Sequence, residues 1–439
     1  MKKFFITFFS LLLSFPTDGY ATINIQPVES ANGISAWLVE DHTIPFMALE
    51  VRFRGGTSLD MPESRGAINL MTSLLDEGAG ELDAQAFARK LEELAAIISF
   101  EATDDAVSVS AKFLSENRNE AVELLKLALT KPRFSPDEID RVREAVLSGL
   151  RADQSDPDVI AANVFAEMAY GNHPYGSSGM GTIESVSAIT RDQIVASHRS
   201  VFALDRVFVG AVGDITKGQL QELIDVLLSD LPLKGGQMPD TAEVNLAGGI
   251  TVVPFETPQS VVVFGQEGIF RDDPDFFPAY VMNHILGGGG FESRLMKEVR
   301  EERGLTYGVY SYLLPKDFAA VYLGGVSSAN DRVAEAVSVI QSNWRRIVES
   351  GVTSDELDAA KVFLTGAYPL RFDGNSRIAR IIVGMQMQNL GLDYVSERNN
   401  MVNAVTLDDV NRVAKELLSL EKLHFVVVGQ PEGLESTDQ

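Results

Sequence analysis

The chain has 439 residues, which is long enough for two or more domains with their own hydrophobic cores. Hydrophobic residues make up 45% of the chain and charged residues 23%, a balance that is typical of folded proteins and excludes a largely disordered one. The net charge of −25 argues against binding to nucleic acid or anionic membrane surfaces, and the absence of cysteine excludes disulfides and thiolate metal sites.

The first 21 residues have the pattern of a secretory signal peptide. Lys2 and Lys3 precede an apolar run from Phe4 to Phe15, and the polar stretch that follows ends at Ala21, after which we expect cleavage. The apolar run, of about 12 residues, is too short to cross roughly 30 Å of hydrocarbon as a helix. The sequence therefore predicts export, with the mature chain in the periplasm and without a transmembrane anchor.

Strand and helix patterns follow one another in the first half of the chain. Apolar and polar residues alternate from Met47 to Phe53 and from Ala106 to Phe113, which predicts half-buried strands. Helical patterns cover 84–95 and 121–129. Strands with one polar face are typical of a largely antiparallel sheet that is covered by helices on its other side, so the predicted fold class is α+β.

A polar stripe marks the predicted helix within Ser64 to Leu74. On a helix, Asn69, Thr72, Ser73 and Asp76 share one face, opposite a row of leucine and methionine side chains. A neutral amide and two hydroxyls are poor Zn²⁺ ligands, and none of them can act as a base near neutral pH. We therefore interpret this stripe as a polar helix face that lines a solvated cleft, not as a metal site.

No other catalytic motif is visible in the sequence. A Gly-x-Ser-x-Gly elbow is absent, and Gly287–Gly290 lacks the Lys-Ser/Thr that follows a phosphate-binding loop. His173 is interpreted as a turn residue. The five histidines are scattered, and no two of them have the spacing of metal ligands on a helix: His42, His173, His198, His284 and His424.

The chain contains the same design twice. A helix that begins at a threonine N-cap and leads into a strand occupies 190–213 and recurs at 406–429, at an offset of 216. A second motif at 134–140 recurs at 352–358, at an offset of 218. A period this long indicates duplicated domains. The predicted organisation is a signal peptide (1–21), an N-terminal domain (22–233), a linker rich in chain breakers (234–240), a C-terminal domain (241–432) and an acidic tail (433–439).

The second half carries a helix that ends in a glycine turn. The pattern predicts a helix from Ser293 to Arg303, a left-handed Gly304 and a strand that begins at Leu305-Thr306-Tyr307. Arg300 on the last turn and Tyr307 on the strand can then face one cleft. Two alternatives stay open: Arg300 pairs with acidic neighbours on a solvated helix, and Tyr307 packs in the sheet.

These motifs resemble those of the pitrilysin/insulinase family of zinc peptidases, the inverzincins. In that family the first half carries Gly-x-x-His-x-x-Glu-His, and here Asn69, Thr72 and Ser73 stand in the places of His, Glu and His. The family's third ligand, a glutamate on a later helix, would fall near Ser148-Gly149, and neither residue can bind zinc. The resemblance extends over both halves, but the zinc motif itself is missing.

The resemblance implies a role for Arg300 and Tyr307. In the family, an arginine and a tyrosine seven positions apart bind the substrate backbone and stabilise the tetrahedral intermediate across from the zinc. Arg300 and Tyr307 have that spacing, with Arg303 as the competing arginine. A guanidinium can hold carbonyl oxygens, and a phenol can donate to an oxyanion.

The resemblance also implies a partner. In the two-subunit branch of the family, one subunit carries the zinc and the other carries the Arg/Tyr pair. We therefore expect a non-catalytic subunit of an exported heterodimeric zinc metalloendopeptidase, inactive alone, whose homologous partner has the intact His-x-x-Glu-His motif. The chain itself would hold no cofactor, with zinc in the partner. Its two domains would form half of a clam-shell chamber that admits peptides or unfolded protein segments.

Members of this family bind extended peptides by adding a strand to a sheet edge. The run Ile97–Ala102 resembles that edge, which makes Ser99 and Phe100 candidate substrate-binding residues. The main alternative function is a non-enzymatic scaffold of the same fold, monomeric or homodimeric, that binds peptides or assembles with other proteins. An active metallopeptidase with unorthodox ligands is a third reading, which the ligand chemistry disfavours.

Overall fold

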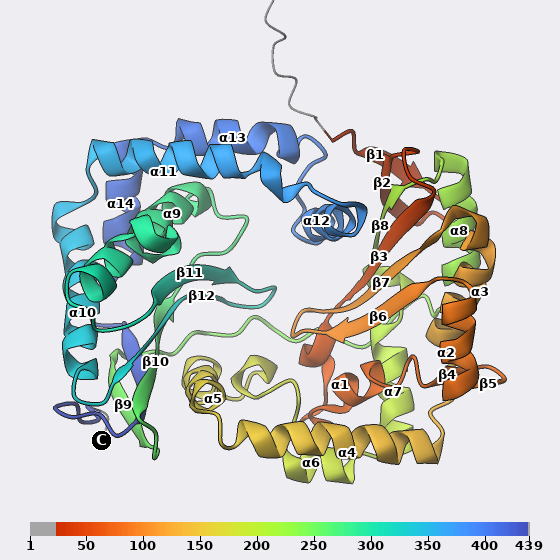
Figure 1. Cartoon of the computed structure of the whole chain (residues 1–439), viewed down its shortest axis with the longest axis horizontal. Coiled ribbons are helices and arrows are strands. Elements are labelled where there is room, and N and C mark those ends of the chain that lie inside the picture. The colour runs from red at the N-terminus through yellow and green to blue at the C-terminus, as the bar shows by residue number, and fades with distance from the viewer. Residues whose placement is uncertain (1–22, 438–439) are drawn as a thin grey trace, which may run out of the picture.

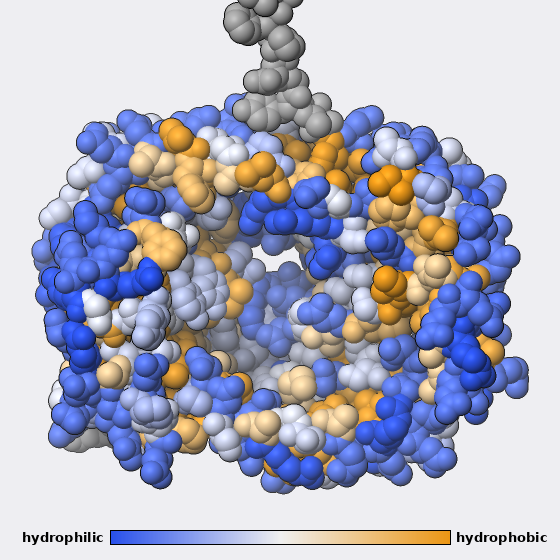
Figure 2. Space-filling view, in the orientation of Figure 1, coloured by the Kyte–Doolittle hydropathy of each residue, from blue (hydrophilic) through white to orange (hydrophobic). Residues whose placement is uncertain are grey.

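The computed structural model describes residues 23–437, so the predicted signal peptide lies outside the described residues. Two halves lie side by side, and each contains one main sheet (Figure 1). The space-filling view shows a hollow between them (Figure 2). Within residues 23–437, no helix combines the length and the apolar character needed to cross a membrane.

The first-half sheet has six strands in the order β1-β2-β8-β3-β7-β6. Its strands are β1 (Gln26–Glu29), β2 (Ser35–Glu40), β3 (Phe46–Arg54), β6 (Ile97–Ala102), β7 (Ala106–Leu114) and β8 (Val207–Gly213), and β4 (Gly78–Ala79) pairs with β5 (Leu82–Asp83) beside it. The helices of this half are α1 (Ala67–Thr72), α2 (Ala84–Glu93), α3 (Arg118–Thr130), α4 (Pro136–Asp153), α5 (Pro157–Tyr170), α6 (Ile183–Ala188), α7 (Arg191–Val201) and α8 (Lys217–Leu228).

The second-half sheet has five strands in the order β11-β12-β10-β13-β9. Its strands are β9 (Gly249–Pro254), β10 (Gln259–Glu267), β11 (Val309–Pro315), β12 (Ala320–Ala329) and β13 (His424–Gly429). The helices are α9 (Phe276–Asn283), α10 (Val333–Ser350), α11 (Ser354–Ala367), α12 (Asn375–Met387), α13 (Tyr394–Ala404) and α14 (Leu407–Leu417). The segment between α8 and β9 contains no helix or strand.

The predicted α+β class is confirmed, with largely antiparallel sheets that pack against helices. One parallel pair interrupts each sheet, β2 with β8 and β13 with β9. Thr190 and Thr406 are N-caps as predicted, and each forms a reciprocal capping box with the residue three positions on. The strand β9 was not predicted.

Each half covers the other half's sheet with one helix. Helix α5 of the first half packs on β10 and β13 through Ala161, Phe165 and Ala169, and α12 of the second half packs on β3 and β8 through Ala379 and Ile382. The two helices begin 218 residues apart, at the offset of the sequence repeat. The duplicated units have therefore exchanged equivalent helices.

Because of this exchange, both faces of β3 are buried. Its alternation predicted a solvated polar face, yet Ala48 and Glu50 on that face are 2% and 1% exposed. The covering layer is α12, which comes from more than 300 residues further along the chain. The buried carboxylate of Glu50 accepts hydrogen bonds there from Arg52 at 2.8 Å and from Ser110 at 2.5 Å.

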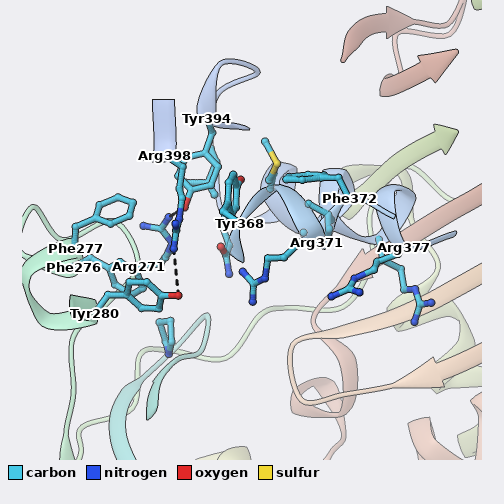
Figure 3. A pocket seen from close by; sticks show the side chains of 17 residues that line it. Arg271, Phe276, Phe277, Tyr280, Tyr368, Arg371, Phe372, Arg377, Tyr394 and Arg398 are labelled. Atoms are coloured by element: carbon cyan, nitrogen blue, oxygen red, sulfur yellow. Dashed lines mark hydrogen bonds between the residues drawn. The ribbon is translucent and has the colours of Figure 1, made fainter. Parts of the chain in front are cut away.

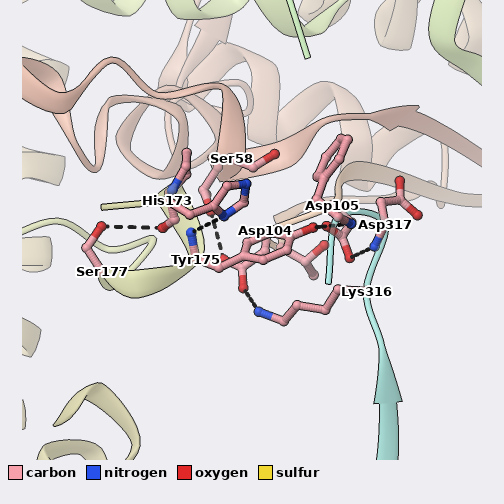
Figure 4. A network of polar contacts seen from close by, with 12 residues as sticks. Ser58, Asp104, Asp105, His173, Tyr175, Ser177, Lys316 and Asp317 are labelled. Carbon is pink, nitrogen blue, oxygen red and sulfur yellow. Dashed lines mark hydrogen bonds and ion pairs between the residues drawn. The ribbon is translucent and has the colours of Figure 1, made fainter. Parts of the chain in front are cut away.

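Two hairpins, β6–β7 and β11–β12, point toward each other across the middle of the molecule (Figure 1). At their tips Lys316 forms an ion pair with Asp104, and the Asp317 N–H donates to Asp105 at 3.3 Å (Figure 4). Tyr175 also donates its hydroxyl to Asp105. The halves are therefore joined by polar contacts at the hairpin tips as well as by the exchanged helices.

Candidate functional site

A buried ion pair fixes the start of α1, the helix that carries the polar stripe. Asp60 accepts the backbone N–H groups of Gly66 at 2.8 Å and Ile68 at 2.9 Å, and it lies 3.6 Å from the guanidinium of Arg65. Burial raises the pKa of Asp60 to about 6. Arg65 in turn donates to the carbonyl oxygen of Ser177 at 2.8 Å, so the helix start is tied to the loop after α5.

The stripe itself differs from the prediction at its end. Helix α1 stops at Thr72 because the next N–H groups, of Leu74 and Leu75, bond three residues back instead of four, so Asp76 lies in a turn beyond the helix. Thr72 is 3% exposed, and its hydroxyl has no hydrogen-bond partner among the described residues. Ser73 donates its hydroxyl to the carbonyl oxygen of Asn69 at 3.0 Å. Thr72 is therefore buried and does not line a cleft.

These residues do not fit a zinc ion. The three places of the family's motif carry an amide and two hydroxyls, which are weak ligands for Zn²⁺. Ser148 and Gly149, near the place of the third ligand, are exposed on α4 and offer no carboxylate. No group of three His, Cys, Asp or Glu side chains within residues 23–437 is placed to hold a metal ion. A hydrolytic step that uses zinc cannot be built from this chain's residues alone.

His173 occupies a turn, as predicted. Its Nδ1 accepts the N–H of Tyr175 at 3.1 Å and so caps the short helical turn Pro174–Gly176. Its Nε2 lies 3.0 Å from the carbonyl oxygen of Asp240, and burial lowers its pKa. Both ring nitrogens therefore have partners within the chain.

The predicted peptide-binding edge is an edge strand. β6 pairs with β7 only, so one side of its backbone is open. Ser99 on β6 lines a groove of about 290 Å³ that also contains Glu50, Ser110 and Arg380. Phe100 packs against the first-half core, because successive residues of a strand face opposite sides. The Ser99 side chain thus lies in the groove, whereas the Phe100 side chain lies on the opposite face of the strand.

The predicted Arg/Tyr segment differs in detail from the sequence expectation. The helix ends in a π-helical stretch, Met296–Glu301, and Gly304 has the expected positive φ of 59°. Strand β11 begins only at Val309, so Tyr307 lies in the loop before the strand and is 89% exposed. Tyr307 therefore does not pack in the sheet.

Arg300 and Arg303 have different surroundings. The guanidinium of Arg300 lies 4.5 Å from the ring centroid of Phe291, and within residues 23–437 Arg300 forms no ion pair. Arg303 donates to the carbonyl oxygen of Glu298 at 2.9 Å and pairs with Glu302 at 3.4 Å. Arg303 is thus engaged by its own helix, whereas Arg300 keeps an uncompensated charge.

Tyr307 lines a small cavity on the face of the second-half sheet that α5 covers. This cavity has a volume of about 270 Å³, and its walls include Asp158 at the start of α5, Val261 and Val263 of β10, and Ser327 of β12. No hydrogen bond or ring contact among the described residues joins Arg300 to Tyr307. The stripe on α1 and the Arg/Tyr segment lie in different halves.

Comparison with known proteins identifies the family. Residues 36–183 match the profile of the insulinase family (peptidase family M16), and residues 188–363 match that of the peptidase M16 inactive domain. A *Helicobacter pylori* protein named non-peptidase homolog YmxG is 29% identical over 432 residues, which cover 98% of each chain. A *Bacillus subtilis* protein named uncharacterized zinc protease YmxG is 25% identical over 395 residues, which cover 88% of this chain and 94% of that one.

A solved structure agrees with these sequence matches. The crystal structure of a peptidase M16 inactive domain from *Pseudomonas fluorescens* superposes with a TM-score of 0.87 and 29% sequence identity, over 94% of this chain and 100% of that one. The matches span both halves. The residues that we expect at the positions of the family's zinc motif are Asn69, Thr72 and Ser73. The chain belongs to the M16 insulinase family of peptidases and lacks that family's His-x-x-Glu-His motif.

Proposed function

We propose that this chain is the non-catalytic subunit of an exported, heterodimeric zinc metallopeptidase. A homologous partner supplies the zinc, and this chain contributes Arg300 and Tyr307 to the shared site. The observation that carries the proposal is the 89% exposure of Tyr307, together with an Arg300 that has no carboxylate partner among the described residues. Both residues belong to a chain of a zinc peptidase family in which Asn69, Thr72 and Ser73 offer no good zinc ligand.

The chemistry of the two groups suits that role. A phenol as exposed as that of Tyr307 buries little surface in its own chain, so it is free to contact a second molecule. It can donate a hydrogen bond to an oxyanion, and the guanidinium of Arg300 can hold a peptide carbonyl.

A peptide substrate would enter along the open edge of β6. The backbone of this strand can pair with an extended peptide, and Ser99 faces the adjoining groove. Such a peptide would lie in the hollow between the two halves, where the partner subunit would close over it. Access to an enclosed site of this kind favours peptides and unfolded segments over folded proteins.

The groove on β6 also supports the second candidate, a peptide-binding scaffold without catalysis. The groove is complete within this chain, and it needs no metal and no partner residue. The scaffold, however, gives no reason for an exposed Tyr307 or for an Arg300 that has no ion-pair partner within residues 23–437. We therefore place the accessory subunit first.

The test combines the mature chain with its zinc-bearing homologue from the same organism and measures hydrolysis of quenched fluorescent peptides. We expect hydrolysis by the mixture and none by this chain alone. Arg300→Ala or Tyr307→Phe in this chain should reduce kcat by about 100-fold, the effect of losing one group that stabilises an oxyanion. Arg303→Ala is the matched control, because Arg303 is bound to its own helix.

Complex formation must be checked alongside activity by size-exclusion chromatography, so that a lost interface is not mistaken for lost chemistry. Zinc-dependent hydrolysis by the chain alone would overturn the non-catalytic role. An inactive mixture in which this chain still binds peptides tightly would favour the scaffold. Equal losses in Arg300→Ala and Arg303→Ala would remove the specific role of Arg300.

A further inference from the structure

A second cavity lies where three helices of the second half meet. Its walls come from α9, from the segment Tyr368–Phe372, from α12 and from α13, and its volume is about 470 Å³, within the range of ligand-binding pockets (Figure 3). We call it the arginine pocket, because five arginines line it: Arg271, Arg371, Arg377, Arg380 and Arg398.

The charge of this pocket is opposite to that of the whole chain. No aspartate or glutamate lines it, although the chain has a net charge of −25. None of the five arginines forms an ion pair within residues 23–437. The acidic residues near them in sequence are exposed and do not line the pocket: Asp272, Asp273, Asp373 and Glu397. The pocket therefore concentrates positive charge that the protein itself does not neutralise.

Aromatic rings hold the two inner arginines in place. Arg271 lies 4.2 Å from the ring centroid of Phe276 and donates to the hydroxyl of Tyr394 at 2.7 Å. Arg398 is 4% exposed, lies 4.6 Å from the ring centroid of Tyr368 and donates to the carbonyl oxygen of Leu364 at 2.7 Å. These contacts orient the guanidinium groups without cancelling their charge.

The two outer arginines are free to bind a ligand. Arg371 and Arg377 are exposed, and the described part of the chain gives their side chains no hydrogen-bond or ion-pair partner. Arg371 lies on the turn Pro369–Arg371 before α12 and Arg377 on α12 itself, and Figure 3 shows both side chains extending from these elements into open space. Arg377 lies in the first turn of α12, where the helix dipole also favours an anion.

The arginine pocket joins the groove on β6. Arg380 of α12 lines both cavities, because α12 lies across the first-half sheet. The surface beside the central hollow is hydrophilic where α12 begins (Figure 2). An extended chain that pairs with β6 can therefore reach the arginines without leaving the hollow.

We propose that the arginine pocket binds an acidic peptide segment. Carboxylates of the peptide pair with Arg371 and Arg377, and a neighbouring aromatic side chain of the peptide packs among Phe276, Phe277 and Tyr394. This binding requires only the present chain, so it holds whether or not a partner subunit cleaves the peptide. It selects acidic, aromatic segments over basic ones in a protein that is otherwise strongly acidic.

The test measures binding of two dye-labelled peptides to the mature chain by fluorescence anisotropy. One peptide consists of Glu-Glu-Phe repeats and the other of Gln-Gln-Phe repeats, so the two differ in charge alone. We expect the dissociation constant of the acidic peptide to be at least about ten-fold lower than that of the neutral peptide. One or two charge-assisted hydrogen bonds are sufficient for a difference of this size. The difference should shrink as salt rises from about 50 to about 500 mM, because screening acts on the exposed pair.

The double variant Arg371→Gln/Arg377→Gln should bind both peptides equally. Its control is Arg89→Gln/Arg345→Gln, which removes the same charge from exposed, unpaired positions on α2 and α10 and should keep the preference. Circular dichroism checks that all variants are folded. Equal affinity of the wild type for both peptides, or equal loss in both double variants, would overturn the proposal. The proposal would also be overturned if the pocket bound inorganic polyphosphate through Arg371 and Arg377 but did not bind the acidic peptide.

Discussion

The exchange of helices between the halves depends on a glycine in β8. Gly210 lies under α12, and a Cβ built on it would be 2.7 Å from Cγ2 of Val383, 2.9 Å from Cγ1 of Ile382 and 3.2 Å from the carbonyl oxygen of Ala379. Carbon atoms in good contact are about 3.5–4.0 Å apart. Gly210→Ala would therefore push α12 away from the sheet by roughly 1 Å, and we expect it to lower the free energy of unfolding by about 1–3 kcal/mol.

The same substitution in an open position should have the opposite sign. Gly149 lies on the exposed side of α4, and a Cβ there would meet nothing within 4 Å. Gly149→Ala should raise the free energy of unfolding by about 0.5–1 kcal/mol, because alanine favours a helix interior over glycine. Guanidinium unfolding followed by circular dichroism measures both variants. A Gly210→Ala protein as stable as the wild type would refute the close approach of α12 to β8.

Two further predictions concern single contacts. Burial lowers the pKa of His198 to about 4 and outweighs the carbonyl oxygen of Leu129, which lies 2.9 Å from its Nε2 and acts in the opposite direction, so the neutral ring is favoured in the folded state. The contribution of His198 to the free energy of unfolding is therefore fully present above the pKa of 6.5 that the residue has in the unfolded chain. This contribution, up to about 3 kcal/mol, is lost as the pH falls toward 4. Chemical unfolding at a series of pH values should show this slope in the wild type and a flatter one in His198→Gln. Lys316→Ala removes the ion pair with Asp104 between the hairpin tips and should destabilise the protein by about 1–2 kcal/mol. Lys90→Ala, which breaks an exposed pair on α2, should change stability by less than about 0.5 kcal/mol in the same thermal unfolding assay, and equal effects would contradict a structural role for the hairpin contact.

Local patterns in the sequence were sufficient to predict most individual elements. Alternating residues placed β3 and β7 to within a residue at each end, and the threonine caps at Thr190 and Thr406 placed the starts of α7 and α14. These signals work because strand alternation and helix capping depend on neighbours in sequence. The repeat offset also identified the duplication.

Long-range packing was beyond the reach of such patterns. The apolar stripe of α12 indicates a buried helix, but nothing local says that it covers β3 and β8 of the other half. Gly210 within a run of strand-forming residues was the available signal, since a glycine inside a strand often marks a close approach of another element. For the same reason the burial of Glu50 was not foreseen.

The candidate site was predicted in part. The residue types at Asn69, Thr72 and Ser73 were enough to exclude the family's zinc chemistry, whereas the early end of α1 depends on the turn that follows it. The arginine pocket was missed because its arginines come from separate elements between residues 271 and 398. The interleaved Tyr368, Arg371, Phe372 and Arg377 were the local sign of it in an acidic chain.

The structure explains how the fold persists without the zinc motif. The residues that seat α1 are apolar side chains such as Leu70 and Met71, both fully buried, together with the Asp60–Arg65 pair at the helix start. Of the motif positions, Ser73 is exposed, and Thr72 is buried but its hydroxyl has no hydrogen-bond partner within residues 23–437. Ligands at these positions would therefore serve chemistry and not stability, and their loss leaves the core intact. The exchanged helices make each half necessary to the other, so a chain without metal chemistry still keeps both halves, the groove on β6 and the arginine pocket in one fixed arrangement.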